Sequence, residues 1–183
     1  QKFNWNVNSN VSYNHNEIIE LYNGIDEYER TGSKTKLVVG HSSSEFYINR
    51  YAGVNPANGD ALWLTKDDEL TTEYNEADKV MIGKSFVAPW QGGFGTTISW
   101  NGLSLSSMFS WVANRWMINN DRFFEESNGL YSVYNQSRRL LYDRWKKPGD
   151  ITDIPRYGIT PQMDSRFLEN ASFLRLKNLT LNY

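Results

Sequence analysis

Cysteine is absent from this chain of 183 residues, so it has no disulfide framework, no thiol nucleophile and no thiolate metal site. No uninterrupted apolar run approaches the roughly 18 residues that a membrane-spanning helix needs, so any span across a membrane must be a β-strand. A basic excess is also missing. The formal net charge is −2, which argues against nucleic acid as a partner because no positive field would attract it.

Aromatic residues are plentiful instead. They make up 15% of the chain, with 7 Trp, 11 Tyr and 9 Phe, whereas charged residues are only 22%. Asn, Ser and Gly supply much of the remainder. This composition favours β-strands and large loops over a helical bundle, in a chain long enough for one domain with a sizeable core.

The segment from Phe3 to Asn14 alternates with the two-residue period of a strand. Most odd positions are apolar or aromatic, and the even positions are Asn or Ser. About 9–11 residues of tilted strand cross a bilayer, and aromatic residues mark both ends of such strands. Phe3 and Trp5 near one end and Tyr13 at the other meet both conditions. A half-buried strand of a soluble sandwich would show the same pattern, so this segment alone leaves both interpretations open.

A second alternating pattern runs from Trp90 to Trp100 and continues from Leu103 to Ala113. Asn101-Gly102 lies between the two runs and is the strongest short-range signal for a two-residue hairpin turn. Tryptophans lie beside the turn and at the far ends. The sequence therefore predicts a hairpin of two strands of about ten residues with aromatic ends.

The last segment, 171–183, also alternates, and Leu179, Leu181 and Tyr183 fall on one face. A strand that stops in mid-ladder has an unpaired edge, so we expect it to need a partner outside this chain. The same alternation would place Arg175 and Lys177 among the apolar positions, which is unfavourable in contact with lipid.

Two explanations for these two charges remain open. The upper part of the strand extends beyond the hydrocarbon layer, or a β-bulge near Lys177-Asn178 changes the phase and turns Leu174 and Leu176 to the apolar face.

Four strands thus fall near 3–14, 90–100, 103–113 and 171–183, and long connections cover 15–89 and 114–170. Transmembrane β-barrels have short periplasmic turns and long extracellular loops. Both long connections lie on the same side of the strands, as that topology requires. The predicted fold class is all-β: a partial antiparallel transmembrane β-barrel with one tight turn and two long extracellular loops, covering residues 1–183.

Several motifs resemble the SusC/RagA family of TonB-dependent outer-membrane transporters. The resemblance runs from the first strand to the last residue, and the final motif is the most specific. The motifs are Ser12-Tyr13-Asn14-His15-Asn16-Glu17, Lys79-Val80-Met81-Ile82-Gly83-Lys84, Trp90-Gln91-Gly92-Gly93-Phe94, Trp100-Asn101-Gly102-Leu103-Ser104-Leu105, Asp153-Ile154-Pro155-Arg156-Tyr157 and Leu168-Glu169-Asn170-Ala171-Ser172-Phe173-Leu174-Arg175-Leu176-Lys177-Asn178-Leu179-Thr180-Leu181.

The resemblance implies a large plugged barrel in the outer membrane of a Gram-negative bacterium, of the 22-stranded transporter class. It implies import of oligosaccharides or peptides, a SusD-like lipoprotein that covers the mouth, and energy from the TonB complex through a plug segment that this chain lacks. The chain itself would supply a section of wall, in contact with outer-membrane lipid and with the rest of the barrel, and two loops.

The candidate functional residues follow from this interpretation. The expected lipid-facing residues are Phe3, Trp5, Val7, Val11, Tyr13, Phe94, Ile98, Trp100, Leu103, Leu105, Phe109, Trp111, Leu179, Leu181 and Tyr183. The loop aromatics that could stack on a ligand or meet the lid, or else simply hold the loops together, are Tyr47, Tyr51, Trp63, Trp116, Tyr134 and Trp145.

Other chemistry is not expected. His15 and His41 lie in loop sequence without a carboxylate at metal-ligand spacing, and Asp67-Asp68-Glu69 lacks the alternating ligands and central Gly of a calcium loop. No helix or Lys-Ser/Thr pair follows Gly92-Gly93-Phe94-Gly95, which fits close packing in a strand better than a phosphate loop. No catalytic set can be assembled, so we predict no enzyme activity, no cofactor and no metal.

Two other function classes stay open on the sequence alone. One is a soluble all-β module that binds carbohydrate through its aromatic loops, and the other is an adhesion or scaffold domain at the cell surface. Solubility separates these classes from a barrel section, because the lipid-facing residues would leave an apolar band exposed in plain buffer.

Overall fold

A computed structural model describes residues 3–183; Gln1 and Lys2, part of the predicted 1–183 unit, lie outside the described residues. Four long strands form one antiparallel sheet in the order β1-β9-β10-β13. These strands are β1 (Asn4–Tyr13), β9 (Trp90–Trp100), β10 (Leu103–Ala113) and β13 (Phe173–Asn182). The prediction of an all-β fold with four long antiparallel strands and one tight turn is confirmed.

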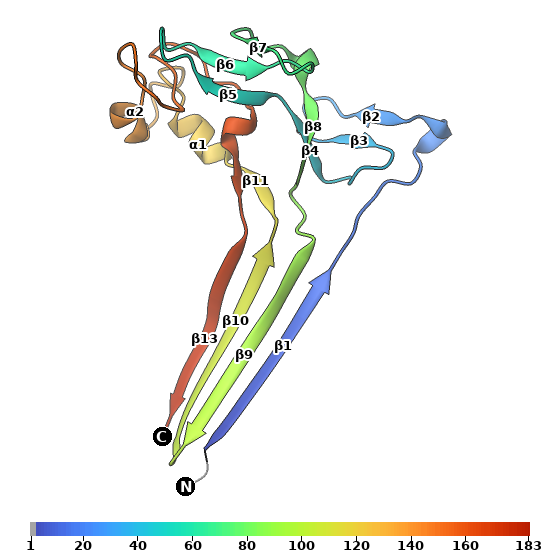
Figure 1. The fold of residues 1–183 in the computed structure, drawn as a ribbon, viewed down its shortest axis with the longest axis vertical. Coiled ribbons are helices and arrows are strands. Elements are labelled where there is room, and N and C mark those ends of the chain that lie inside the picture. The colour runs from blue at the N-terminus through green and yellow to red at the C-terminus, as the bar shows by residue number, and fades with distance from the viewer. Residues whose placement is uncertain (1–2) are drawn as a thin grey trace.

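The turn between β9 and β10 is two residues long because of its sequence. Asn101 has φ of 49° and Gly102 has φ of 86°, and a type I′ turn requires left-handed backbone at both central positions, which Asn-Gly supplies at low cost. Trp100 and Leu103 then pair directly. The turn, the start of β1 and the end of β13 lie at one end of the long sheet, and all other elements lie at the opposite end (Figure 1).

The register of the sheet places most of its apolar side chains on one face and most of its polar side chains on the other. Residues directly opposite one another in adjacent strands point to the same face. One such row is Trp5, Ile98, Leu105 and Leu181, and the adjacent row is Asn6, Thr97, Ser106 and Thr180. We call these the apolar face and the polar face of the sheet.

A bulge in β13 settles the question raised by its two basic residues. Met108 pairs with Asn178, but the next residue, Phe109, pairs with Leu176, so Lys177 is an extra residue in the strand. A bulge of this kind shifts the alternation by one position. As a result Leu176 joins the apolar row of Phe109, and Arg175 pairs with Ser110 on the polar face.

Residues 15–89 and 114–170, which we call the loop domain, fold into small sheets and short helices rather than open loops. Its paired strands are β2 (Glu27–Glu29) with β3 (Lys36–Val38), β4 (Glu45–Ile48) with β8 (Val80–Ser85), β11 (Trp116–Ile118) with β12 (Leu168–Asn170), and β5 (Arg50–Val54), β6 (Ala61–Leu64) and β7 (Leu70–Thr71) in one sheet. Its helices are α1 (Asn120–Glu125) and α2 (Arg139–Tyr142), with 3₁₀ turns η1 (Tyr22–Gly24), η2 (Glu76–Asp78) and η3 (Ser165–Phe167).

Both long connections contribute to one core. Phe46 and Ile48 of β4 pack against Leu168 of β12, and partly buried Ile82, Trp116 and Ile118 surround them. Two segments more than a hundred residues apart are therefore joined by apolar burial, and the loop domain is a unit built from both.

In residues 3–183 no helix has the length and apolarity to cross a membrane.

Candidate functional site

The apolar face of the long sheet is an exposed apolar surface that extends over all four strands. Trp5 is 63% exposed, Val11 65% and Leu181 67%. The predicted lipid-facing residues from Trp5 to Leu181 all lie at the apolar positions of this register, whereas Phe3 and Tyr183 lie just outside the paired residues. The bulge adds Leu174 and Leu176, which the sequence left undecided. A continuous surface of this size marks contact with protein or lipid.

Aromatic side chains mark both ends of this face. At the end nearest the loop domain, Tyr13 and Trp90 have ring centroids 4.4 Å apart. At the turn end lie Trp5 and Trp100, and the indole nitrogen of Trp5 donates a hydrogen bond to Thr96 Oγ1 at 2.8 Å. Transmembrane strands carry such aromatic girdles, because amphipathic rings settle at the membrane interface.

Between the girdles, Phe94 and Phe109 stack at 4.7 Å with their planes 16° apart. Two directly opposite aromatic residues are a favourable cross-strand pair, and this pair fixes the register of β9 and β10 halfway along the hairpin.

The polar face carries hydroxyl and amide groups instead. Thr97 and Ser106 are 3.0 Å apart through their hydroxyl oxygens, and Ser99 Oγ donates to Ser104 Oγ at 3.1 Å. Asn10 Oδ1 accepts from the backbone N–H of Gly93 at 3.0 Å. Such neutral groups suit the wet interior of a barrel, which is polar while the outside is apolar.

Close packing explains the glycines of β9. A Cβ atom on Gly92 would meet the backbone oxygen of Asn10 and would lie 2.9 Å from the Trp111 ring. A side chain there would push β1 away from β9. The Gly-rich stretch of β9 is therefore a packing feature of a strand.

The loop aromatics named by the sequence lie mostly inside the loop domain. Trp63 is only 6% exposed, and its indole nitrogen donates to Asp164 Oδ2 at 2.6 Å. Tyr51 OH donates to the backbone oxygen of Asp153 at 3.0 Å. Both rings are anchored by residues from the other long connection, so they hold the two connections together.

Three more of these aromatics have partners within the loop domain. Trp116 packs on the core, and Lys84 Nζ lies 3.8 Å from the centre of its ring. Trp145 donates from its indole nitrogen to the Pro56 backbone oxygen at 3.1 Å, and Lys36 Nζ lies 4.8 Å from the centre of the Tyr47 ring.

Tyr134 differs from the rest because it is 62% exposed. Val133 beside it is 87% exposed. Its ring centroid lies 6.3 Å from that of Tyr131, and it is the one exposed residue of the six loop aromatics.

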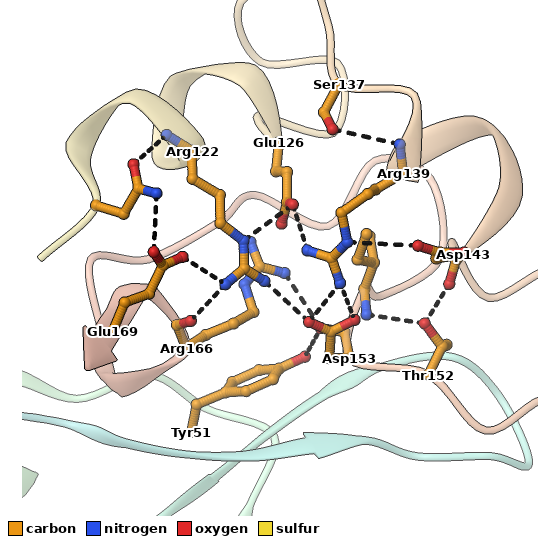
Figure 2. A network of polar contacts seen from close by, with 12 residues as sticks. Tyr51, Arg122, Glu126, Ser137, Arg139, Asp143, Thr152, Asp153, Arg166 and Glu169 are labelled. Atoms are coloured by element: carbon orange, nitrogen blue, oxygen red, sulfur yellow. Dashed lines mark hydrogen bonds and ion pairs between the residues drawn. The ribbon is translucent and has the colours of Figure 1, made fainter. Parts of the chain in front are cut away.

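A network of charged side chains joins α1, α2 and the segment after α2 (Figure 2). Arg122 Nε donates to Glu126 Oε1 at 3.0 Å, and Arg139 Nη1 also donates to that oxygen. Asp153 bridges the same two arginines: its Oδ1 is 2.7 Å from Arg139 Nη2 and its Oδ2 is 2.9 Å from Arg122 Nη2. Glu169, beside the core, is 3.3 Å from Arg122 Nη1.

The electrostatics of this network follow from burial and charge. Burial alone would raise the pKa of the Asp153 carboxyl, but the hydrogen bonds from Arg139 and the charges of Arg139 and Arg122 outweigh it, so the pKa lies below its usual value. Burial raises the pKa of the Tyr51 hydroxyl above its usual value. Sequence reasoning missed this network, because its members are far apart in the chain and carry no local motif.

The two histidines both line a hollow of about 290 Å³ where the long sheet meets the loop domain. His15 Nε2 lies 3.0 Å from Glu17 Oε2, and His41 Nδ1 lies 3.0 Å from Glu45 Oε2. Glu45 also accepts from the backbone N–H of Gly83 at 2.7 Å, which fixes it in place. Within residues 3–183 no cluster of three or more His, Cys, Asp or Glu side chains is placed to hold a metal ion.

Comparison with known proteins places these features in a family context. No family model matches the chain. Among curated proteins, TonB-dependent receptor P39 of Formosa agariphila is 20% identical over all of this chain and 22% of its own length. TonB-dependent receptor SusC of Bacteroides thetaiotaomicron is 26% identical over 99% of this chain and 18% of its own length.

Solved structures are more similar. The RagAB peptide transporter matches with a TM-score of 0.88 and 38% identity over 98% of this chain, and the RagAB peptide importer in the "open-open" state matches with a TM-score of 0.88 and 39% identity. The chain is a section of a SusC/RagA-like TonB-dependent transporter. The predicted resemblance is confirmed.

The transporter section spans about a fifth of the length of the relatives it matches. TonB-dependent receptors of this kind are outer-membrane proteins of Gram-negative bacteria, which confirms the predicted location. The relatives are named as receptors and importers rather than as enzymes.

Proposed function

We propose that this section forms part of the barrel wall and the outer mouth of an importer driven by the TonB complex. The observation that carries the proposal is the register of the long sheet. It gathers the apolar side chains of four strands on one face, between two aromatic girdles, and gathers neutral polar side chains on the other. In this arrangement the apolar face meets lipid and the polar face lines the interior of the barrel.

The loop domain then stands outside the cell. All of its elements lie beyond one end of the long sheet, opposite the tight turn (Figure 1), and barrels of the outer membrane carry their long loops on the extracellular side. The domain has its own core and charged network, so it presents a folded surface. Exposed Val133 and Tyr134 on that surface are the proposed contact with a SusD-like lipoprotein lid.

Peptides are the favoured cargo, and oligosaccharides are the alternative. The similar structures are those of a peptide transporter and a peptide importer, at 38–39% identity over nearly the whole chain. The plug, and through it the TonB complex, would be supplied by the remainder of the transporter. We propose no catalytic role, cofactor or metal for this section.

Uptake by whole cells tests this function. Cells that carry the full-length transporter, cells with the gene deleted, and cells in which TonB is inactive are each given fluorescent peptides or fluorescent oligosaccharides of mixed length. Peptide uptake that requires both the transporter and TonB is the expected result. Uptake of oligosaccharides alone would replace the proposed cargo, and uptake that does not depend on TonB would refute the proposed mechanism.

The soluble-module alternative makes a different prediction for the isolated chain. A soluble sandwich would cover its apolar face with a second sheet, but in residues 3–183 that face stays exposed, with Trp5 at 63% and Ile98 at 39%. We therefore expect the isolated chain to require detergent. A compact monomer in plain buffer, shown by light scattering on a sizing column, would favour the soluble module instead.

A further inference from the structure

Arg175 is the only charged side chain in the polar rows of the described sheet. Its row contains Asn10, Gly93 and Ser110, all neutral. The rows above and below it carry Ser, Asn, Gln, Gly and a few apolar residues. The next charged residue of β13, Lys177, is the unpaired residue of the bulge and lies outside these rows. The Arg175 side chain is exposed among the described residues, and charged groups inside membrane proteins usually pair with one another.

The bulge is what places Arg175 on this face. In a regular ladder without the bulge, Lys177 would pair with Phe109, and Arg175 would fall in the apolar row of Trp111. The guanidinium carbon also lies 4.7 Å from the centre of the Phe173 ring, and an arginine stacked on an aromatic face has less conformational freedom to lose when it binds. Two local features therefore orient the side chain.

Its own surroundings do not neutralise it. The ion pairs formed among residues 3–183 do not include Arg175. Ser110, directly opposite Arg175, has a hydroxyl that is buried without a hydrogen-bond partner among the described residues, and Gly93, one strand further away, has no side chain. A carboxylate partner of Arg175 would therefore lie outside residues 3–183.

We propose that Arg175 forms an ion pair with a carboxylate of the plug, the polypeptide that fills the barrel. This inference rests on the proposed function, since it needs the polar face to line a plugged interior, as in transporters of the largest barrel class. The remaining four-fifths of a transporter of this size can supply that polypeptide. A permanent partner fits better than a passing cargo molecule, because a fixed guanidinium would be left unpaired between transport cycles.

The test places a photo-reactive benzophenone amino acid in the full-length transporter, in its native membrane, at position 175 or at position 176. Leu176 is the matched control, because it is the next residue and points to the apolar face. After illumination, mass spectrometry identifies the cross-linked partners. We expect position 175 to cross-link to a plug segment that contains Asp or Glu, and position 176 to cross-link to lipid.

The two failures are distinguishable. In the first failure, position 176 captures lipid, but position 175 does not capture an acidic plug segment. It captures only lipid, a neighbouring strand, added peptide cargo or a plug segment without an acid. This result overturns the ion pair and leaves the proposed role of this section in the barrel wall intact. If position 176 also captures plug, or the protein is absent from the outer membrane, the proposed orientation fails and the ion pair fails with it.

A double-variant cycle then tests the charge itself. Arg175→Gln, neutralisation of the acid found by cross-linking, and the two together are compared by the midpoint of thermal unfolding in detergent. An ion pair predicts that each single variant lowers the midpoint and that the double variant falls no further than the worse single one. Arg175→Lys should restore part of the loss, because it keeps the charge but not the planar fork. Strictly additive losses would overturn the pairing.

Discussion

Glu126 is the most deeply buried carboxylate in residues 3–183, at 1% exposure, and it receives hydrogen bonds from two arginines through one oxygen. Its other oxygen, Oε2, has no partner among the described residues. A buried carboxylate is tolerated only when nearby cations neutralise it, and removing those cations is costly. Glu126 therefore ties α1 to α2, and its charge balances Arg122 and Arg139 together with Asp153.

We predict that Glu126→Gln weakens this junction. The neutral amide leaves the two guanidiniums with less compensating charge, and the loss of a charged hydrogen bond in a buried site costs about 2 kcal/mol. Hydrogen exchange of the α1 amides in the purified transporter should then speed up by roughly thirtyfold. Glu125→Gln, at the exposed neighbouring position, is the control and should leave exchange unchanged. Equal exchange in both variants would contradict this role.

Asp153 gives the loop domain a predicted sensitivity to acid. Its pKa is lower in the folded protein than in the unfolded chain, so its contribution to stability is present above the usual Asp value of about 3.9 and is lost as the pH falls through the lowered value. We expect α1 exchange, corrected for its intrinsic pH dependence, to show constant protection from pH 8 to pH 5 and a fall below about pH 4. Asp153→Asn should reduce that acid-dependent fall, whereas Asp67→Asn, at an exposed position, should not.

The bulge in β13 shows how one extra residue decides which side chains on one side of it lie on the apolar face. Removing either Lys177 or Leu176 would leave a regular ladder in which Asn178 still pairs with Met108 and Arg175 still pairs with Ser110. Only the second deletion places Lys177 opposite Phe109 on the apolar face. A lysine near the bilayer midplane costs roughly 2–4 kcal/mol.

We therefore predict that deletion of Lys177 is tolerated and that deletion of Leu176 lowers the amount of folded transporter. Folded barrel in outer-membrane fractions is measured by its heat-dependent shift in SDS gels. The two deletions are matched in length and position, so they control for each other. If both deletions lower the yield equally, folding requires the bulge itself and not only the assignment of side chains to faces that it produces.

The four long strands could be predicted from the sequence because each repeats a two-residue pattern over about ten positions, and because Asn101-Gly102 marks their turn. The strands of the loop domain, such as β7 at Leu70–Thr71, are too short to show a period. Their pairings depend on a core shared by segments more than a hundred residues apart. The charged network around Glu126 was missed for the same reason.

Strand register was the other feature that could not be predicted from the sequence. The alternation in 171–183 is equally regular with or without a bulge, so Arg175 could not be assigned to a face until its pairing with Ser110 was known. The loop aromatics show the converse: Trp63 and Tyr51 were candidates for ligand contact by residue type, but their hydrogen bonds to Asp164 and the Asp153 backbone belong to the interior of the loop domain.

The shape of the whole section determines how its two ends are oriented in a membrane. The turn at Asn101-Gly102 and the loop domain lie at opposite ends of the long sheet (Figure 1), so in a membrane they must lie on opposite sides. The absence of cysteine makes this directly testable, since a cysteine introduced in this section is its only thiol.

We predict that Val133→Cys and Ile151→Cys, at positions 87% and 97% exposed on the loop domain, react with a membrane-impermeant maleimide on intact cells. Asn101→Cys, in the turn, should react only after the outer membrane is permeabilised, because barrels carry their short turns on the periplasmic side. The heat-dependent gel shift verifies that each variant is folded, and the transporter without an added cysteine gives the background. Labelling of Asn101→Cys but not Val133→Cys on intact cells would reverse the orientation and remove the loop domain from the extracellular mouth.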